Sequence, residues 1–493
     1  MTAAALAIPH IHYLAIGPVL ILFGAALALL MASALARRTL SSAVTSAVTL
    51  TAALGAFAAT FVQWSFVAHH GPTTTIAHAI VLDGFSVVAS AVVALSLALA
   101  TLVAHDWAKR EGVLGAEYQI LALASAAGAV LMTQANDLIV IFLGLEILSI
   151  GLYVLVAFDR HRATSSEAGL KYFLLGGFAS AIFIYGAALV YGATGSTNLT
   201  SISYFLGANV LLRPGLLYAG GAMLLVGFSF KVAAVPFHLW SPDVYEGAPT
   251  PVTGFMAAIV KVGAFAALIR VLISALGTQL ATFRPILWAL VAATTLLGAS
   301  VALLQRNAKR MLAYSSINHA GFMLLGVWAG TVRGTAATLF YLMTYAPMVV
   351  ATFAVVTLVG GPGDEGHAIE RYRGLARRQP WLGGALAVLL LAQLGVPLTT
   401  GFYAKFAVLS AAVDAGAGLL ALLALLAAAI AAYFYLRWVM ALYAEEDLGG
   451  QRVAVPWSSG LAIGAGVAAT VLFGLWPGPL AALAQHATVL FTP

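Results

Sequence analysis

The sequence has 493 residues, of which 62% are hydrophobic and only 8% are charged, and its formal net charge is +6. Soluble domains carry about 25% charged residues, so the composition indicates an integral membrane protein. The absence of cysteine excludes disulfides, thiolate metal sites and a thiol nucleophile. The sequence also lacks the glycine-rich fingerprints of nucleotide-binding sites.

Fourteen apolar stretches follow one another along the chain, and each is long enough for a membrane-crossing helix of about 20 residues. The short alternating segments of a β-barrel are absent. We therefore predict an all-α integral membrane protein with about 14 transmembrane helices, the first retained because no signal-peptide cleavage site follows it. Residues 201–215 are too short and mixed to cross and are expected at the outer interface. The predicted spans are 14–35, 43–67, 79–104, 115–133, 137–157, 168–193, 216–240, 251–275, 283–304, 312–330, 334–359, 382–414, 417–443 and 458–476.

The basic residues of the connecting loops predict the orientation of the chain. Loops after odd-numbered spans contain fourteen Lys and Arg residues, including the run RYRGLARRQP, whereas loops after even-numbered spans contain three. Cytoplasmic loops carry the excess of Lys and Arg, so the first set is expected in the cytoplasm and both termini on the outer side. This placement explains the positive charge without a nucleic-acid partner.

Four of the six lysines fall inside predicted spans: Lys171, Lys231, Lys261 and Lys405. A cation at the bilayer centre costs about 2.5–3.5 kcal/mol on insertion scales. Lys171 is near a cytoplasmic helix end, where its ammonium could extend to the headgroups. The other three lie nearer mid-span, and Glu146 is the one carboxylate predicted deep within a span.

These charges suggest a proton relay. A carboxylate about 4 Å from an ammonium contributes ~4 kcal/mol at an effective dielectric near 20. Contact with Glu146 would therefore hold a proton on a buried lysine, and separation would release it. The alternative is that Glu146 only neutralises one lysine to join two helices, which leaves the other lysines unexplained.

Two of the lysines lie beside predicted helix breaks. Lys231 precedes Pro236 and His238, and Lys405 follows the interruption at 397–401. Proline breaks a helix, and a broken helix inside a membrane is tolerated where it lines a cavity. Matching breaks in two halves are typical of inverted-repeat transporters, here spans four to eight and nine to thirteen. His319 is either a further relay group, because histidine titrates near neutrality, or a hydrogen-bonded core residue.

Four blocks of the sequence resemble a known family: GLEILSIGLYVLVAF, SSEAGLKYFLLGGFASAIFIYGAALVYGATG, FKVAAVPFHLWSPDVYEGAPTPVTGFMA and AKRMLAYSSINHAG. They are similar to the antiporter-like membrane subunits of bacterial respiratory complex I, the NADH-quinone oxidoreductase, and most closely to the subunit N family. The likeness extends from about residue 80 onward. A lysine rather than a glutamate at Lys405, and the lack of room for a long C-terminal lateral helix, favour subunit N over subunits M and L.

The resemblance implies fourteen helices with helices 7 and 12 broken, and a row of buried ionisable residues along the membrane midplane. It places Glu146 in span five with Lys231 as its partner, Lys261 centrally in span eight and Lys405 at the end of the row, with Lys171 and His238 also on positions of the pattern. It divides the chain into an N-terminal three-helix part (1–110), two five-helix repeats (111–278 and 279–446) and a last helix (447–493).

The resemblance further implies a multi-pass protein of the bacterial inner membrane that translocates protons and binds no cofactor. NADH, FMN, iron–sulfur clusters and quinone are expected on partner subunits, and other complex I membrane subunits are the expected neighbours. Two alternatives remain open from the sequence: a subunit of a cation/proton (Na+/H+) antiporter complex of the same superfamily, and a purely structural membrane anchor.

Overall fold

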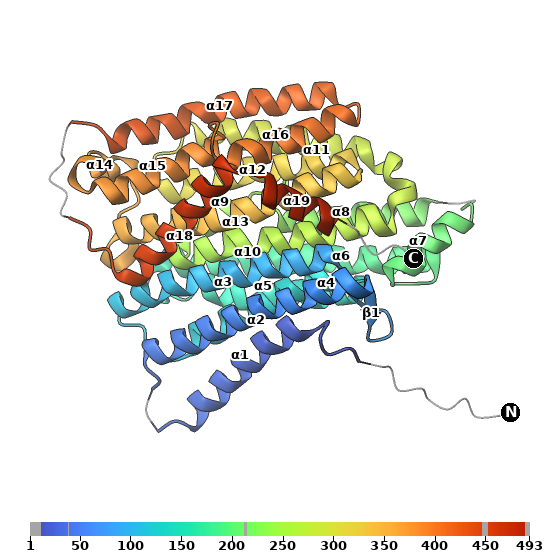
Figure 1. Ribbon diagram of the computed structural model, residues 1–493, viewed down its shortest axis with the longest axis horizontal. Coiled ribbons are helices and arrows are strands. Elements are labelled where there is room, and N and C mark those ends of the chain that lie inside the picture. Colours follow the sequence, from blue (N-terminus) through green and yellow to red (C-terminus); the bar gives the residue numbers. More distant parts are fainter. Residues whose placement is uncertain (1–10, 38, 212–213, 446–451, 489–493) are drawn as a thin grey trace.

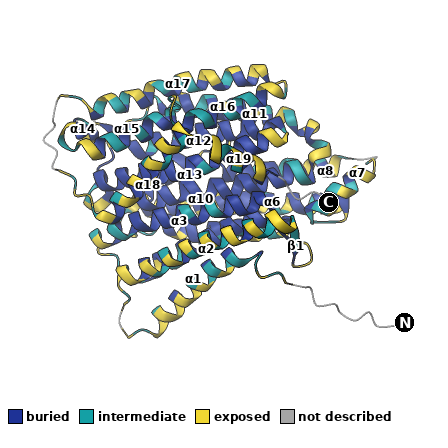
Figure 2. Cartoon of the chain, viewed as in Figure 1, coloured by how far each residue is buried: buried dark blue, intermediate teal, exposed yellow. Residues whose placement is uncertain are grey.

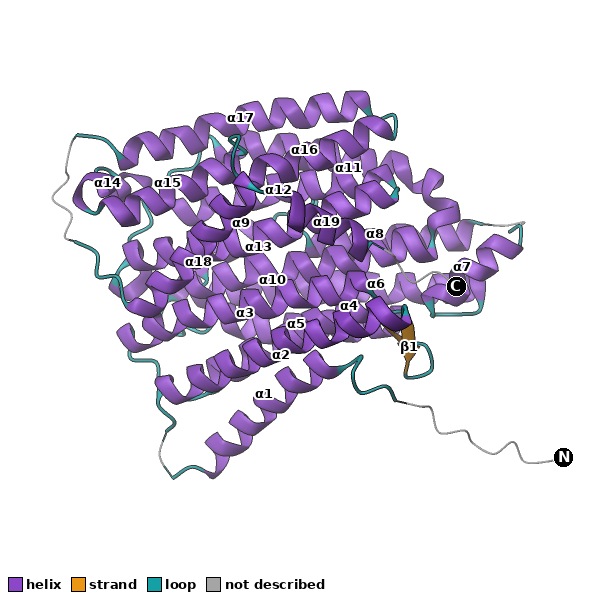
Figure 3. Cartoon of the chain, viewed as in Figure 1, coloured by secondary structure: helices purple, strands orange, loops and turns teal. Residues whose placement is uncertain are grey.

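The computed structural model describes residues 11–37, 39–211, 214–445 and 452–488. In these residues the chain is a bundle of helices with a common long direction (Figure 1), and its one two-stranded hairpin, β1 (Thr73–Thr75) paired with β2 (Ile80–Leu82), lies at one end (Figure 3). The predicted all-α class is confirmed. The α-helices are α1 Gly17–Leu35, α2 Ser42–His70, α3 Gly84–Arg110, α4 Glu117–Gln134, α5 Leu138–Val156, α6 Ala163–Thr194, α7 Leu199–Ala208, α8 Gly215–Lys231, α9 Trp240–Gly247, α10 Thr250–Ile269, α11 Leu280–Ala302, α12 Ala308–Ala329, α13 Val332–Gly360, α14 Leu375–Arg378, α15 Pro380–Leu394, α16 Thr400–Asp414, α17 Gly418–Leu442, α18 Trp457–Leu475 and α19 Gly478–Ala487.

Ten helices of the described chain are long and apolar enough to cross a membrane. The other four predicted spans are α4 and α12, which are more polar, and the two broken spans α8–α9 and α15–α16. Of the segment predicted at the interface, residues 201–208 belong to α7, a helix of ten residues, and residues 212–213 lie outside the described chain. The short helix α19 and the β1–β2 hairpin were not expected from the sequence.

Contacts between loops show that successive spans run in opposite directions. After odd-numbered spans, Arg162 of one loop contacts Asp364 of another, and Asn307 pairs with Ala368. After even-numbered spans, the backbone N–H of Asn136 donates to the carbonyl oxygen of Ala79 in the hairpin. The two sets of loops therefore gather at opposite ends of the bundle, as fourteen crossings require.

Both predicted helix breaks are present. The first spans residues 232–239, between α8 and α9, and the second spans residues 395–399, between α15 and α16. In the first break Ala233 has a positive φ of 59°, the Val235 N–H donates to Thr294 Oγ1 at 2.9 Å, and the Trp240 indole N–H donates to the Phe230 carbonyl oxygen at 2.9 Å. These bonds satisfy polar groups that a break would otherwise leave unpaired in a lipid environment.

The order of helices in the second half of the chain repeats the order in the first half. Three unbroken helices, a broken one and a further unbroken one occupy residues 117–275, and the same order recurs in residues 280–442. The central helices are α10 and α13, and the most apolar stretch of α13 is entirely buried, whereas only 22% of that of α1 is buried (Figure 2). Helices that are apolar on all sides belong in such a core, and the buried lysines lie in and beside it.

Candidate functional site

Lys231 is the last residue of α8, directly before the first break, and its side chain is buried. Its Nζ donates to Ser149 Oγ on α5 at 2.5 Å and to Tyr172 Oη on α6 at 3.4 Å. The same ammonium lies 5.2 Å from the centre of the Tyr172 ring and 5.7 Å from that of Tyr153. Aromatic faces attract a cation at these distances, so Lys231 has a polar and aromatic pocket built by α5 and α6.

Among the described residues Glu146 and Lys231 form no direct ion pair, and their role in a relay stays a prediction. The Lys231 ammonium instead contacts Ser149, three residues and about one turn along α5 from Glu146. Glu146 is half-buried, its Oε1 atom has no hydrogen-bond partner in the described chain, and its charge acts on Lys231 from a greater distance. Glu146 and Lys231 therefore lie about one helical turn from a direct contact.

Lys261 lies in the middle of α10 and is buried among apolar residues. Its Nζ donates to the carbonyl oxygen of Val232 at 3.4 Å and lies 6.0 Å from the centre of the Tyr345 ring. Val232 is the C-cap of α8 and directly follows Lys231. The C-terminal carbonyls of a helix are unpaired and carry partial negative charge, so Lys261 provides a positive partner for the end of the first half-helix.

Lys405 makes the equivalent contact at the second break. Its Nζ donates to the carbonyl oxygens of Gln393 and Leu394, the last two residues of α15, at 3.0 and 2.7 Å. It also lies 5.1 Å from the centre of the Phe322 ring, and its side chain is buried. In both halves, a lysine ammonium therefore faces the carbonyl end of an interrupted helix.

His319 on α12 lies between these two lysines. Its Nδ1 is 2.7 Å from Tyr341 Oη and its Nε2 is 3.2 Å from Tyr435 Oη. The ring centres of His319 and Tyr345 are 5.0 Å apart, and the charges of Lys261 and Lys405 both act on His319. The structure thus brings Lys261, His319 and Lys405 into one neighbourhood in the core.

The remaining two predicted residues are placed differently. His238 lies within the first break and is buried, and its Nδ1 has no hydrogen-bond partner in the described chain. Lys171 is partly exposed and forms ion pairs with Glu167 at 2.7 Å and Asp243 at 2.9 Å. Lys171 therefore belongs to the end of the bundle with the basic loops rather than to the buried row.

Sequence reasoning missed a buried charge cluster around Asp364, in the connection between α13 and α14. Lys309 was expected in a loop, but it is the second residue of α12 and its side chain is fully buried. Its Nζ donates to the Ala248 carbonyl oxygen at 2.5 Å and to Asp364 Oδ2 at 3.3 Å. Asp364 also accepts from the N–H of Thr250 at 2.9 Å and from its hydroxyl at 2.6 Å. The turn sequence GPGDEGH gave no sign of this burial.

The pKa of Asp364 reflects these contacts. Burial opposes its ionisation, but the charge of Lys309 and the hydrogen bonds from His367 and Thr250 outweigh burial and hold the pKa of the carboxyl well below its usual range. His367 Nε2 lies 3.1 Å from Asp364 Oδ1, and burial lowers the pKa of its imidazole. Asp364 is therefore an anion that connects the starts of α10 and α12.

A second buried ion pair, also missed, lies at the opposite end of the bundle. Arg270, in the π-helical continuation of α10 (Arg270–Ala275), donates to Asp83 Oδ1 at 2.7 Å and to the Thr133 carbonyl oxygen at 2.9 Å. Asp83 is the N-cap of α3, where its side chain accepts from the Ser86 N–H. The sequence signal was available, because an arginine within an apolar stretch requires a partner.

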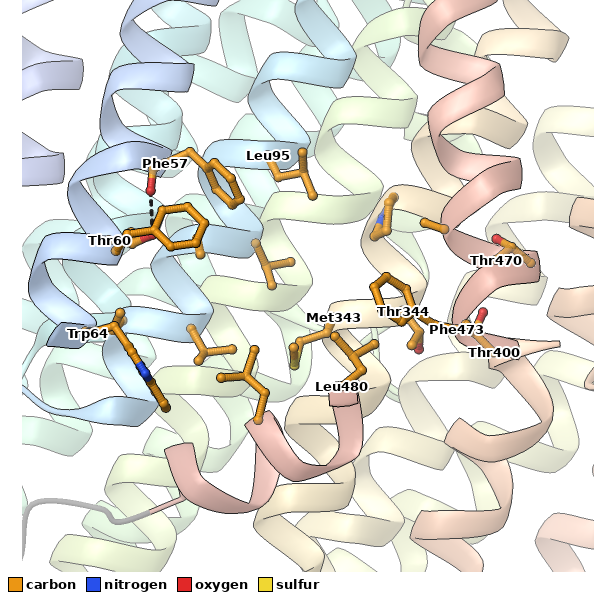
Figure 4. A pocket seen from close by; sticks show the side chains of 18 residues that line it. Phe57, Thr60, Trp64, Leu95, Met343, Thr344, Thr400, Thr470, Phe473 and Leu480 are labelled. Carbon is orange, nitrogen blue, oxygen red and sulfur yellow. Dashed lines mark hydrogen bonds between the residues drawn. The ribbon is translucent and has the colours of Figure 1, made fainter. Parts of the chain in front are cut away.

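Two cavities of the described chain differ in the side chains that line them. A polar cavity of about 570 Å³ opens at the end with the basic loops and is lined by residues that include Lys171, Asp243, Glu246, Asp364 and His367. An apolar cavity of about 360 Å³ lies between α2, α3, α13, α16, α18 and α19; it has no ionisable side chain, and Thr400 at the start of α16 points toward it (Figure 4). Only the polar cavity provides groups that can exchange protons.

Comparisons with known proteins identify the family. Residues 135–431 match the family described as NADH:quinone oxidoreductase/Mrp antiporter, transmembrane. NADH-quinone oxidoreductase subunit N 3 of Streptomyces griseus is 46% identical over 395 residues, covering 78% of this chain and 71% of the relative. Subunit N of Trichlorobacter lovleyi is 40% identical over 436 residues, covering 86% and 88%. The chain belongs to the NADH-quinone oxidoreductase subunit N family.

Solved structures agree with membership of the subunit N family. A chain of respiratory complex I from Thermus thermophilus with bound aureothin is 36% identical and superimposes with a TM-score of 0.81, over 95% of this chain and 99% of that one. A chain of the Mrp complex from Dietzia has a TM-score of 0.83 at 20% identity, over 97% and 96%, and shares the fold. The subunit N fold is therefore also the fold of an antiporter complex.

Proposed function

We propose that the chain is the proton-translocating membrane subunit of an NADH-quinone oxidoreductase, in which Glu146, Lys231, Lys261, His319 and Lys405 relay protons. The observation that carries the proposal is the repeated placement of a lysine ammonium at the carbonyl end of an interrupted helix. Broken helices with charged partners at their ends form the binding sites of many membrane transporters.

The order of groups suggests how the relay works. Lys231 contacts Ser149, Lys261 contacts the residue after Lys231, and Tyr345 and His319 lie between Lys261 and Lys405. A proton that moves from one group to the next changes the charge that its neighbours experience, because electrostatic effects are strong at low dielectric. His238 and Lys171 are proposed as auxiliary groups, since the first lies in the break and the second lines the polar cavity.

The relay must be driven by the rest of the complex. Moving one charge against 100 mV costs about 2.3 kcal/mol, so translocation requires an energy source outside this chain. We propose that NADH, FMN, iron–sulfur clusters and quinone bind partner subunits, whose redox reaction supplies that energy, and that this chain itself is a non-redox subunit of the translocase. Neighbouring antiporter-like and small membrane subunits are the proposed partners.

We further propose a location in the bacterial inner membrane, with both termini on the periplasmic side. The basic loops after odd-numbered spans gather at one end of the bundle, which supports this orientation. The proposed units are the N-terminal three helices (1–110), the repeats 111–278 and 279–446, and the final segment 447–493.

The proposal is tested by Lys231→Ala and Glu146→Ala in membrane vesicles that contain the assembled complex. NADH-driven proton uptake, followed with a pH-sensitive dye, is expected to fall at least tenfold in Lys231→Ala and measurably in Glu146→Ala, with assembly on native gels unchanged. Lys109→Ala, which removes an exposed lysine of α3, is the matched control. Normal uptake in both test variants would leave a structural anchor as the better account.

The shared fold with an Mrp complex favours a second candidate, a cation/proton antiporter subunit. The two functions differ in what drives the transport. If proton movement requires a sodium gradient and persists without NADH, the antiporter function is correct. If it requires NADH and a quinone and is unaffected by replacing sodium with choline, the complex I function stands.

A further inference from the structure

A long groove lies on the surface of the bundle between α15 and α18, away from the buried lysines. It has a volume of about 1060 Å³ and is lined along most of its length by apolar or small side chains, including Val388, Leu391, Ile463 and Val467. Its floor is deepened by the absence of a side chain at Gly464, where an added Cβ would have no neighbour within 4 Å. An apolar groove of this size on a membrane-spanning surface accommodates a hydrocarbon chain.

One end of the groove is cationic. Arg378 of α14 and Arg452 of the connection between α17 and α18 both line it. Their sequence neighbours are hydrogen-bonded to each other: the Gln379 side chain donates to the Val453 carbonyl oxygen at 2.7 Å and accepts from the Val453 N–H at 2.8 Å. The positive end is therefore built by two segments that are distant in sequence.

Aromatic side chains mark the same end. Trp381, at the start of α15, has 93% of its surface exposed, and Tyr443, which follows α17, has 50% exposed, and both line the groove. Tryptophan and tyrosine concentrate at the level of lipid headgroups. The label of α14 and the start of α15 lie at the left end of the bundle in Figure 1, the end with the basic loops. The apolar part of the groove therefore extends from the headgroup level into the bilayer.

We propose that this groove binds one anionic phospholipid, with the phosphate between Arg378 and Arg452 and an acyl chain along α15 and α18. Guanidinium groups bind phosphate oxygens in a bidentate manner, and basic pockets between helices at the cytoplasmic side recognise anionic headgroups. The charge at the groove's end selects an anionic lipid over a zwitterionic one. The site goes beyond proton translocation, and only the choice of the cytoplasmic leaflet rests on the orientation proposed above.

Native mass spectrometry of the full-length chain in mild detergent tests the proposal, with dioleoylphosphatidylglycerol and dioleoylphosphatidylcholine as probes. Each basic residue near an anionic surface contributes about fivefold in affinity, or ~1 kcal/mol at 1.4 kcal/mol per tenfold. Arg452→Gln is therefore expected to reduce the preference for phosphatidylglycerol about fivefold. Arg37→Gln, which removes an exposed arginine of the α1–α2 loop, is the matched control and should leave the preference unchanged.

Filling the groove tests the acyl-chain part independently. Gly464→Leu places a side chain into open space on α18 and is expected to abolish tight retention of both lipids. Gly24→Leu makes the same change on α1, where an added Cβ also meets nothing within 4 Å, and should retain them. Equal lipid binding by wild type, Arg452→Gln and Gly464→Leu would overturn the proposal.

A cross-linking experiment distinguishes lipid from a neighbouring protein in native membranes. Since the chain contains no cysteine, Gly464→Cys introduces a unique thiol for a maleimide-linked photoreactive group. A mass increase equal to one phospholipid after illumination supports the proposal. A cross-link to another membrane subunit, in place of lipid, would show that the groove is a subunit contact and would refute it. Proton pumping is not measured here, so this outcome is independent of the relay.

Discussion

Replacing Asp364 by Asn tests whether the buried charge cluster stabilises the fold. Asp364 accepts two hydrogen bonds from Thr250, ion-pairs with Lys309 at 3.3 Å, and contacts Arg162 at 3.3 Å and His367 at 3.1 Å. Its residue surface is 3% exposed and that of Lys309 is 0%. An amide at this position keeps the shape but removes the charge that Lys309 requires.

The expected loss in the free energy of unfolding is about 3–5 kcal/mol, the usual effect of removing one partner of a buried ion pair. The partly exposed contact with Arg162 adds little, because solvent screens it. The double variant Asp364→Asn, Lys309→Met removes the buried ammonium that Asp364→Asn leaves without its carboxylate, so it should be more stable than Asp364→Asn alone. The coupling energy between the two sites is expected to reach about 1–3 kcal/mol.

Unfolding in mixed micelles of increasing SDS content, followed by tryptophan fluorescence, provides the measurement. The pKa of Asp364 is lower in the folded chain than its unfolded value near 3.9, so its contribution is complete above about pH 4 and is lost as pH falls through the folded pKa. The difference between wild type and Asp364→Asn should therefore be constant at neutral pH and shrink only below about pH 4.

A difference smaller than about 0.5 kcal/mol at neutral pH, or additive effects in the double variant, would refute this account of the cluster. The exposed pair Lys171–Glu167 offers a control on the same end of the molecule. Glu167→Gln should change the free energy of unfolding by less than about 1 kcal/mol, because exposed ion pairs contribute little.

Three further predictions follow from other contacts. Ser149→Ala removes the 2.5 Å partner of Lys231, and since hydrogen bonds to charged groups are worth ~1.5–3 kcal/mol, NADH-driven proton uptake should fall roughly tenfold or more with normal assembly; unchanged uptake would contradict the proposed path. Arg270→Gln removes the guanidinium that pairs with buried Asp83 and should lower the free energy of unfolding by about 3–5 kcal/mol in the SDS assay. Adding Asp83→Asn should restore part of this loss. Gly401→Ala would place a methyl group against the carbonyl oxygen of Ala392, so it should cost at least ~1–3 kcal/mol in the same assay, whereas Gly384→Ala, which meets nothing, should have little effect.

Much of the fold was predictable because lipid imposes simple rules. Apolar stretches of sufficient length, the distribution of arginine and lysine, Pro236 and the interruption at 397–401 were enough to predict the spans and both breaks. The hairpin at 73–82 and α19 were missed. Their hydrogen bonds and packing depend on segments distant in the chain, such as the bond between Ala79 and Asn136.

The sequence indicated that the lysines of the candidate site are exceptional but did not indicate what they contact. The sequence identified lysines in apolar stretches, since each is costly there. It did not show that Lys261 and Lys405 contact backbone carbonyls, or that Lys231 contacts Ser149 rather than Glu146. Backbone carbonyls are common to all residues, and only the three-dimensional path of the helices determines which of them a lysine reaches.

The contacts of Lys405 with Gln393 and Leu394 have a mechanical consequence. The Lys405 ammonium, on α16, donates hydrogen bonds to the last two carbonyl oxygens of α15. The contact between the two half-helices therefore depends on a proton that can be removed. Thermodynamic reciprocity then applies: if protonation strengthens the joint, pulling the half-helices apart must weaken proton binding by the same free energy. A force on α16 that separates the half-helices would therefore lower the affinity of Lys405 for its proton.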